Sequence, residues 1–90
     1  MRIADYLNHG QANAVPLRNL ESKTGLDGRT VRRLIAVERR AGTPILSDNA
    51  TGYFLLGNDS ERMRFVRSMR SRAKEILDAA EAVEKARVFE

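Results

Sequence analysis

The fold is decided by residues 17–35, whose sequence is LRNLESKTGLDGRTVRRLI. The first half of this stretch predicts a short helix, and the second half predicts another helix with an arginine-rich face. Between them, Gly25 can take the left-handed backbone conformation that ends a helix without steric cost. Asp27 is a typical N-cap residue, because its carboxylate accepts hydrogen bonds from the free amides of the following helix. We therefore predict two helices that meet at a tight turn.

Flanking residues set the outer bounds of these two helices. Pro16 suits the first turn of a helix, where its missing amide hydrogen costs nothing, so the earlier helix is predicted over about residues 16–24. The later helix is predicted to begin after Asp27 and to end near Ala41. Gly42 is a good terminating residue, and Pro44 prevents the helix from continuing.

Two further elements are predicted around this pair. Residues 2–8 have apolar side chains at helical spacing and predict a first helix. Residues 45–47 and 53–56 predict two short strands around the turn-rich tip at 48–52, which together form a hairpin. A lone hairpin is marginally stable in water, so it must pack on the helices. The side chains expected to face inward are Leu46, Tyr53 and Leu55.

The C-terminal third of the chain predicts one long helix. Asn58 and Glu61 have the spacing of a capping box, and no helix-breaking residue follows until about Ala86. Its apolar residues alternate steps of three and four, which is an a/d heptad pattern. These residues, which we call the seam, are Val66, Met69, Ala73, Ile76, Ala80 and Val83. The seam predicts either packing against the rest of the chain or pairing with a second copy.

Charge along this helix favours one orientation of such a pair. Residues 59–74 carry a net charge of +4, whereas residues 75–90 carry −3. Two parallel helices would place like charges side by side, whereas antiparallel helices place each basic half beside an acidic half. We therefore expect an antiparallel homodimer. Residues 1–57 are predicted as one domain, and residues 58–90 as the dimerisation element. The alternative use of the basic half is contact with phosphate.

Composition excludes several classes of function. The chain has 90 residues, no cysteine and one histidine, so a disulfide framework, a thiolate nucleophile and a cysteine-ligated metal are excluded. Spacing reveals no nucleophile-and-base set, and we expect a protein that is not an enzyme and that has no metal, cofactor or small-molecule substrate. Neither a signal peptide nor a membrane span is visible. The expected location is therefore the cytoplasm.

The helix predicted after Asp27 has a cationic outward face. At 100° per residue, Arg29, Arg33 and Arg40 lie opposite the apolar side, and Arg32 lies on a flank. The whole chain has a net charge of +4 and a pI near 10.1. Such a helix fits the major groove of DNA, where arginine binds guanine or phosphate. An exposed helix face is also often charged only because it is solvated.

The combined pattern resembles the winged helix-turn-helix of the biotin-repressor amino-terminal type, and small bacterial and prophage proteins that add a helical tail. The resemblance covers roughly residues 2–57 and rests on residues 24–35 (TGLDGRTVRRLI), 42–45 (GTPI) and 52–55 (GYFL). It implies a mainly α fold with a small β-hairpin, in which the helix after Asp27 binds double-stranded DNA. The wing tip at 48–52 differs from a wing that binds phosphate, because it contains neither Arg nor Lys.

These observations give two hypotheses. The first is a dimeric transcriptional regulator or phage-associated factor that binds duplex DNA in a sequence-directed way. The groove residues would be Arg29, Arg32 and Arg33, assisted by Thr30, and the residues near phosphate would be Arg18, Lys23 and Arg40. The second hypothesis is a winged-helix module that binds another protein and makes no direct DNA contact.

Overall fold

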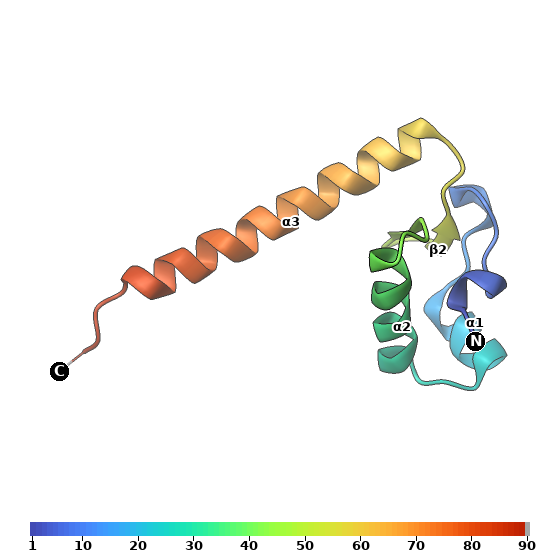
Figure 1. The fold of residues 1–90 in the computed structure, drawn as a ribbon, viewed down its shortest axis with the longest axis horizontal. Coiled ribbons are helices and arrows are strands. Elements are labelled where there is room, and N and C mark those ends of the chain that lie inside the picture. The colour runs from blue at the N-terminus through green and yellow to red at the C-terminus, as the bar shows by residue number, and fades with distance from the viewer. Residues whose placement is uncertain (90) are drawn as a thin grey trace.

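The computed structural model describes residues 1–89 and consists of a compact group of elements with one long helix projecting from it (Figure 1). In chain order the elements are the 3₁₀ turns η1 (Ile3–Tyr6) and η2 (Gln11–Asn13), the helices α1 (Leu17–Thr24) and α2 (Gly28–Arg40), the strands β1 (Ile45–Asp48) and β2 (Gly52–Leu55), and the helix α3 (Asp59–Lys85). The predicted fold class, mainly helical with one hairpin and a long C-terminal helix, is confirmed.

Three names are used below for parts of the chain. The head is residues 1–58, the docked turns are residues 59–72 of α3, and the arm is residues 73–85 of α3. The molecule measures 53 × 31 × 25 Å along its principal axes, and the long dimension reflects the arm (Figure 1).

The turn between α1 and α2 is built by local hydrogen bonds, as the sequence predicts. Gly25 has a φ of +75°, and its amide donates to the Glu21 carbonyl at 2.9 Å. The Asp27 carboxylate accepts a hydrogen bond from the Thr30 amide at 2.8 Å. Pro16 is the N-cap of α1, so the helix begins at Leu17, one residue after the predicted start. The two helix bounds therefore agree with the sequence prediction to within a residue.

The prediction of a helix over residues 2–8 is wrong, because the structure has only the 3₁₀ turn η1 there. Its first amides bond to a side chain of α2. The Glu38 carboxylate accepts hydrogen bonds from the Ile3 amide at 2.7 Å and from the Ala4 amide at 3.0 Å. Beyond η1 the chain must extend to pair with β2, and this pairing prevents a longer helix.

The hairpin is antiparallel, and it gains a third partner from the N-terminal segment. Ile45 pairs with Leu55, and Asp48 pairs with Gly52. On the other side of β2, the Val15 and Tyr53 main chains exchange two hydrogen bonds at 2.8 and 2.9 Å. Gly52 has a φ of +116°, and a Cβ there would collide with the Val15 carbonyl oxygen. Only glycine therefore fits this turn without strain.

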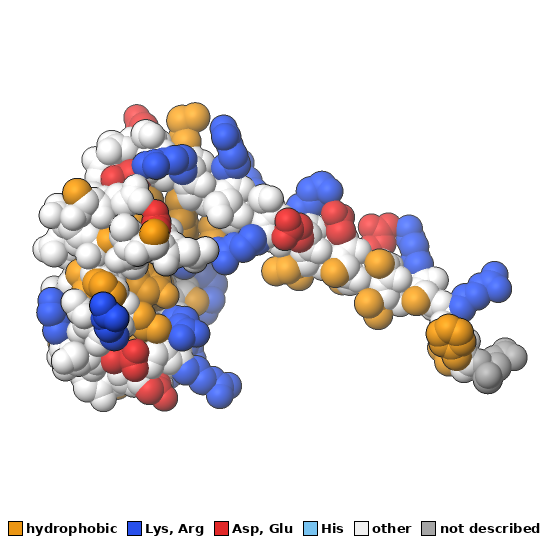
Figure 2. Space-filling view, turned by 180° about the vertical axis from the view of Figure 1, so that it is seen from behind, with side chains coloured by type: hydrophobic (Ala, Val, Ile, Leu, Met, Phe, Trp, Pro, Cys, Tyr) orange, Lys and Arg blue, Asp and Glu red, His pale blue; other side chains and the backbone are white. Residues whose placement is uncertain are grey.

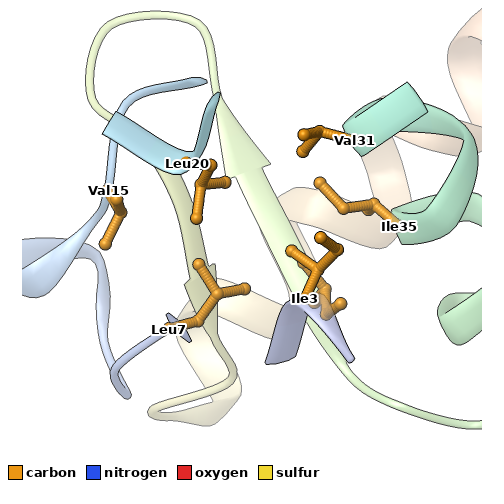
Figure 3. Packing of buried hydrophobic residues seen from close by; sticks show 7 residues of the cluster. Ile3, Leu7, Val15, Leu20, Val31 and Ile35 are labelled. Carbon is orange, nitrogen blue, oxygen red and sulfur yellow. The ribbon is translucent and has the colours of Figure 1, made fainter. Parts of the chain in front are cut away.

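The core of the head lies between η1, α1, α2 and the hairpin. Its most buried side chains are Ile3, Leu20, Val31, Ile35 and Ile45, each at most 1% exposed. Several of them converge from opposite sides of the head (Figure 3). A buried cluster of this kind gives a small domain most of its stability.

Both faces of the hairpin are covered, which the sequence analysis missed. Leu46 is buried as predicted, whereas Tyr53 and Leu55 are only half-buried. Phe54, which was not predicted to face inward, is 4% exposed. Leu46 and Phe54 pair across the hairpin on the face turned to the docked turns, where they line one hollow with Phe65. The expected alternation of buried and exposed side chains along the strands is therefore absent, because α3 covers the second face of the hairpin.

The docked turns are held by a buried carboxylate. Asn58 accepts a hydrogen bond from the Glu61 amide at 2.9 Å, which is half of the predicted capping box. Instead of bonding back to Asn58, the Glu61 carboxylate accepts from the Gln11 and Gly57 amides, both at 2.9 Å. Glu61 is 7% exposed. One side chain therefore joins α3, the N-terminal segment and the loop before α3.

The arm extends away from the head and does not fold back on it (Figure 1). Ile76 is 69% exposed and Val83 is 76% exposed. The seam of the arm is therefore uncovered in a single chain. Among the described residues, 1–89, the structure contains no helix that is both long and apolar enough to cross a membrane.

Candidate nucleic-acid interface

The outward face of α2 presents exposed arginines along its length. Arg29, Arg33 and Arg40 are all exposed, on the side opposite the buried Val31 and Ile35. In the space-filling view, basic side chains lie over this side of the head, which faces the arm (Figure 2). The predicted clustering of guanidinium groups on one open face is therefore present in the single chain.

The start of α2 is fixed by its cap. The pKa of the Asp27 carboxyl is held below its usual value, first by a hydrogen bond from the Thr30 side chain and then by one from the Thr30 amide. Arg33 adds an electrostatic attraction in the same direction. Asp27 therefore stays charged near neutral pH and orders the first turn that carries Arg29. Thr30, a predicted helper of base contact, donates its amide to this cap.

A second basic surface lies between α2 and the wing, which is the hairpin with its tip. We call it the basic hollow, a cavity of about 570 Å³ open to solvent. Arg18 at the start of α1, Arg32 and Arg39 on α2, and Arg72 on α3 all line it. The hollow brings together Arg18 and Arg32, both predicted DNA contacts, and does not include Lys23, which is exposed in the last turn of α1.

Arg39 serves mainly to join three elements. Its Nε donates to the Ile45 carbonyl at 2.6 Å, and its guanidinium carbon lies 4.9 Å from the centre of the Phe65 ring. Burial is the main cause that lowers the pKa of this guanidinium from its ordinary value. Arginine remains protonated at any physiological pH, so Arg39 adds positive charge to the hollow while it ties α2 to β1 and α3.

Arg72 is a residue of the hollow that sequence reasoning did not single out. It was grouped with the other basic residues of α3, and its guanidinium approaches the Met69 sulfur at 3.0 Å. Only the docking of α3 against the hairpin brings Arg72 to the edge of the hollow. The signal in the sequence was its place beside the seam, which by itself does not indicate a contact with the wing.

The wing tip contributes polar groups and no positive charge. Asp48 turns its carboxylate to the tip, where it accepts hydrogen bonds from the Ala50 amide at 2.6 Å and the Thr51 amide at 3.3 Å. The Gln11 side-chain amide donates to the same carboxylate. Asn49 and Thr51 are exposed. Asp48 therefore stabilises the turn, and the tip offers only neutral hydrogen-bonding groups to a ligand.

Comparisons of this chain with protein-family models, curated proteins and solved structures gave no match. A stiff, capped helix carries exposed arginines on one side, and a concave basic surface lies beside it. Groups of this kind bind anionic polymers through charge and through bidentate hydrogen bonds.

Proposed function

We propose that this protein binds double-stranded DNA in a sequence-directed way, with α2 in the major groove. The observation that carries the proposal is the row of exposed Arg29, Arg33 and Arg40 on a helix whose opposite side is buried. An α-helix with its side chains is about 10–12 Å wide, and the major groove is about 12 Å wide. A helix supported from behind can therefore enter the groove as a rigid unit.

Each arginine has a distinct role in this proposal. Arg29, Arg32 and Arg33 lie in the first half of α2 and read base edges, because arginine donates two parallel hydrogen bonds to guanine O6 and N7. Arg40 lies at the end of α2, and Arg18 and Lys23 lie on α1. These three contact phosphate, which positions the protein without reading sequence. The neutral wing tip lies alongside the duplex and adds hydrogen bonds at most.

The proposal includes a homodimer that forms through α3. The seam residues of the arm are exposed in the single chain, and exposed apolar stripes of this length are typical of interaction surfaces. The basic docked turns and the more acidic end of α3 favour an antiparallel pair. A dimer doubles the DNA contacts. In this proposal the protein is a bacterial, cytoplasmic transcriptional regulator or a phage-associated factor.

The proposal is tested by a double variant, Arg29→Ala with Arg33→Ala. A duplex is first selected from a random pool by the wild-type protein, and affinity is then measured by fluorescence anisotropy. Arginine contacts of this kind contribute about 1–3 kcal/mol each, so we expect a loss of at least about 30-fold. Both side chains are exposed, and the circular dichroism spectrum should be unchanged.

The matched control is Lys74→Ala with Lys85→Ala, which removes the same charge from exposed positions of the arm that lie outside the seam. It should leave duplex affinity within about threefold of the wild type. Equal losses in the two variants would show a general effect of charge and would overturn the groove assignment. Affinity for duplex that does not fall as salt is raised would favour the alternative, a winged-helix module that binds a protein.

A further inference from the structure

An apolar groove lies on the molecule at the junction of the head and α3, on the other side of Arg39 from the basic hollow. Its volume is about 440 Å³. The apolar residues that line it are Pro44, Ile45, Leu46, Leu56, Phe65, Val66 and Met69. The basic residues at its edge are Arg39, Arg62 and Arg70. An apolar floor with cationic edges fits an apolar segment that carries acidic residues.

The seam of α3 runs directly into this groove. Val66 and Met69 are the first two seam residues, and both line the groove. The space-filling view shows apolar side chains along one edge of the arm, with most of its charged side chains on the other edge (Figure 2). The groove and the uncovered seam therefore form one continuous apolar surface.

The seam is symmetric about its midpoint, which defines a register for two antiparallel copies. In that register Val66 lies opposite the partner's Val83, Met69 opposite the partner's Ala80, and Ala73 opposite the partner's Ile76. Each of the last two pairs joins a large side chain with a small one, so the layers fill without voids. The same register places the end of the partner's α3 over the apolar groove.

Charge supports this register at the edge of the groove. The partner's Glu84 lies three residues along the axis from the level of Arg62 and five from that of Arg70, which correspond to about 4.5 and 7.5 Å. Long side chains span such distances. The acidic end of one α3 is therefore matched to the basic edge of the other groove.

Residues 86–89 cannot reach the groove of their own chain. From Val66 to Lys85 along α3 is about 28 Å at 1.5 Å per residue. The four residues 86–89 reach back at most about 14 Å when fully extended. As long as α3 is intact, residues 86–89 can therefore reach this groove only in a second copy.

We propose that Val88 and Phe89 of a second copy fill the apolar groove, with the partner's Glu84 at its basic edge, and close the antiparallel dimer. This inference rests on the proposed homodimer and names the site that completes it. Val88 is 90% exposed and Phe89 is 100% exposed in the single chain. Bound in the groove, both side chains lie against Pro44 and Leu56, and each groove of the dimer receives one segment.

Engineered cysteines test this placement, because the chain contains no cysteine of its own. In the double variant Pro44→Cys with Phe89→Cys, mild oxidation should produce a disulfide-linked dimer on a denaturing gel. Pro44 is exposed and lies outside α3, so the substitution leaves the seam intact. The matched control is Ala50→Cys with Phe89→Cys, which puts the first cysteine at the exposed wing tip and should stay largely unlinked.

Sedimentation of the wild-type protein and of the reduced double variant separates the possible failures. A double variant that is a dimer and gives no more disulfide than the control would overturn the groove assignment and leave the homodimer standing. Because the double variant lacks Phe89, only a wild-type protein that is monomeric at micromolar concentration would overturn both, and the duplex affinity of the wild-type protein reports on DNA binding independently. As a second measurement, Phe89→Ser should weaken dimerisation at least tenfold, and Met63→Ser, exposed and outside the groove, should not.

Discussion

The helix α2 of the head and the helix α3, which continues into the arm, begin alike and are buried differently. Asp27 is the N-cap of α2 and Asn58 is the N-cap of α3, and in both cases the capping side chain accepts a hydrogen bond from an amide three residues on. α2 then buries Val31 and Ile35 in the head, whereas the arm leaves Ile76 and Val83 mostly in water. The same local signals therefore produce one helix with a core to pack against and another without one. We propose that a partner covers the apolar residues of the arm.

The largest expected effect is on the unfolding free energy of the head, which should fall for a substitution in α2 and not for one in the arm. Ile35→Ala removes a side chain that is 1% exposed, and such core truncations cost about 2–5 kcal/mol of unfolding free energy. Ile76→Ala removes one that is 69% exposed and should change the stability of the head by less than about 0.5 kcal/mol. Urea unfolding followed by tyrosine fluorescence measures this, because both tyrosines, Tyr6 and Tyr53, lie in the head.

The effects of these two variants on dimerisation should be in the opposite order to their effects on the stability of the head. Ile76→Ala should weaken the dimer in sedimentation equilibrium, whereas Ile35→Ala, at concentrations where the head is folded, should not. Equal destabilisation of the head by both substitutions would mean that the arm packs on its own head in solution, and the contrast between the two regions would be lost.

An intermediate effect is expected at the junction, where Glu61 joins the head to α3. Glu61→Gln leaves one amide oxygen to serve the Gln11 and Gly57 amides, so one of them loses its acceptor. The loss of stability should be clear and smaller than that of Ile35→Ala. Thermal unfolding measured side by side at pH 7 provides the comparison.

The pH dependence of this difference has a definite sign. The Gln11 amide is the main cause that lowers the pKa of the Glu61 carboxyl below its usual 4.5. A lowered pKa in the folded state means that the charged form stabilises the protein above that usual value, and that this contribution is lost as pH falls through the folded pKa. The advantage of wild type over Glu61→Gln should therefore shrink below about pH 4.5. A constant difference from pH 7 to pH 3 would contradict the assignment.

The smallest effect concerns the ion pairs of the arm. Lys74 lies 2.9 Å from Asp78, and both side chains are well exposed. Exposed pairs at this spacing contribute about 0.3–0.5 kcal/mol. Lys74→Ala should therefore change the helical signal in circular dichroism only slightly and leave the unfolding of the head unaltered. A shift of the unfolding midpoint comparable to that of Glu61→Gln would show that the arm and the head unfold as one unit.

The parts of the fold that local chemistry controls were predictable from the sequence. Gly25 and Asp27 define the turn between α1 and α2, and Gly42 follows the end of α2, because glycine and capping residues act through their own backbone surroundings. The hairpin and the long helix followed from strand-forming residues and from heptad spacing in the same way. The arginine face of α2 also required only the helical period.

Features that depend on distant parts of the chain were not predictable. Glu38 accepts hydrogen bonds from the first amides of η1, and Glu61 accepts one from the Gln11 amide, because the topology brings these groups together across 35 and 50 residues of sequence. Phe54 is buried only because α3 covers the outer face of the hairpin. For the same reason the candidate site contains Arg72, whose position beside the wing depends on how α3 docks.

The pairing of the N-terminal segment with β2 has a consequence for how the protein behaves at high concentration. Strands with a free side attract foreign strands and promote edge-to-edge aggregation. Here β1 lies on one side of β2, and the main chains of Gly10 and Val15 bond to the other at 2.8 Å. Both edges of β2 are therefore paired within the chain, and neither is open to a strand from another chain. Loss of the first fifteen residues would leave this edge of β2 unpaired and would favour aggregation.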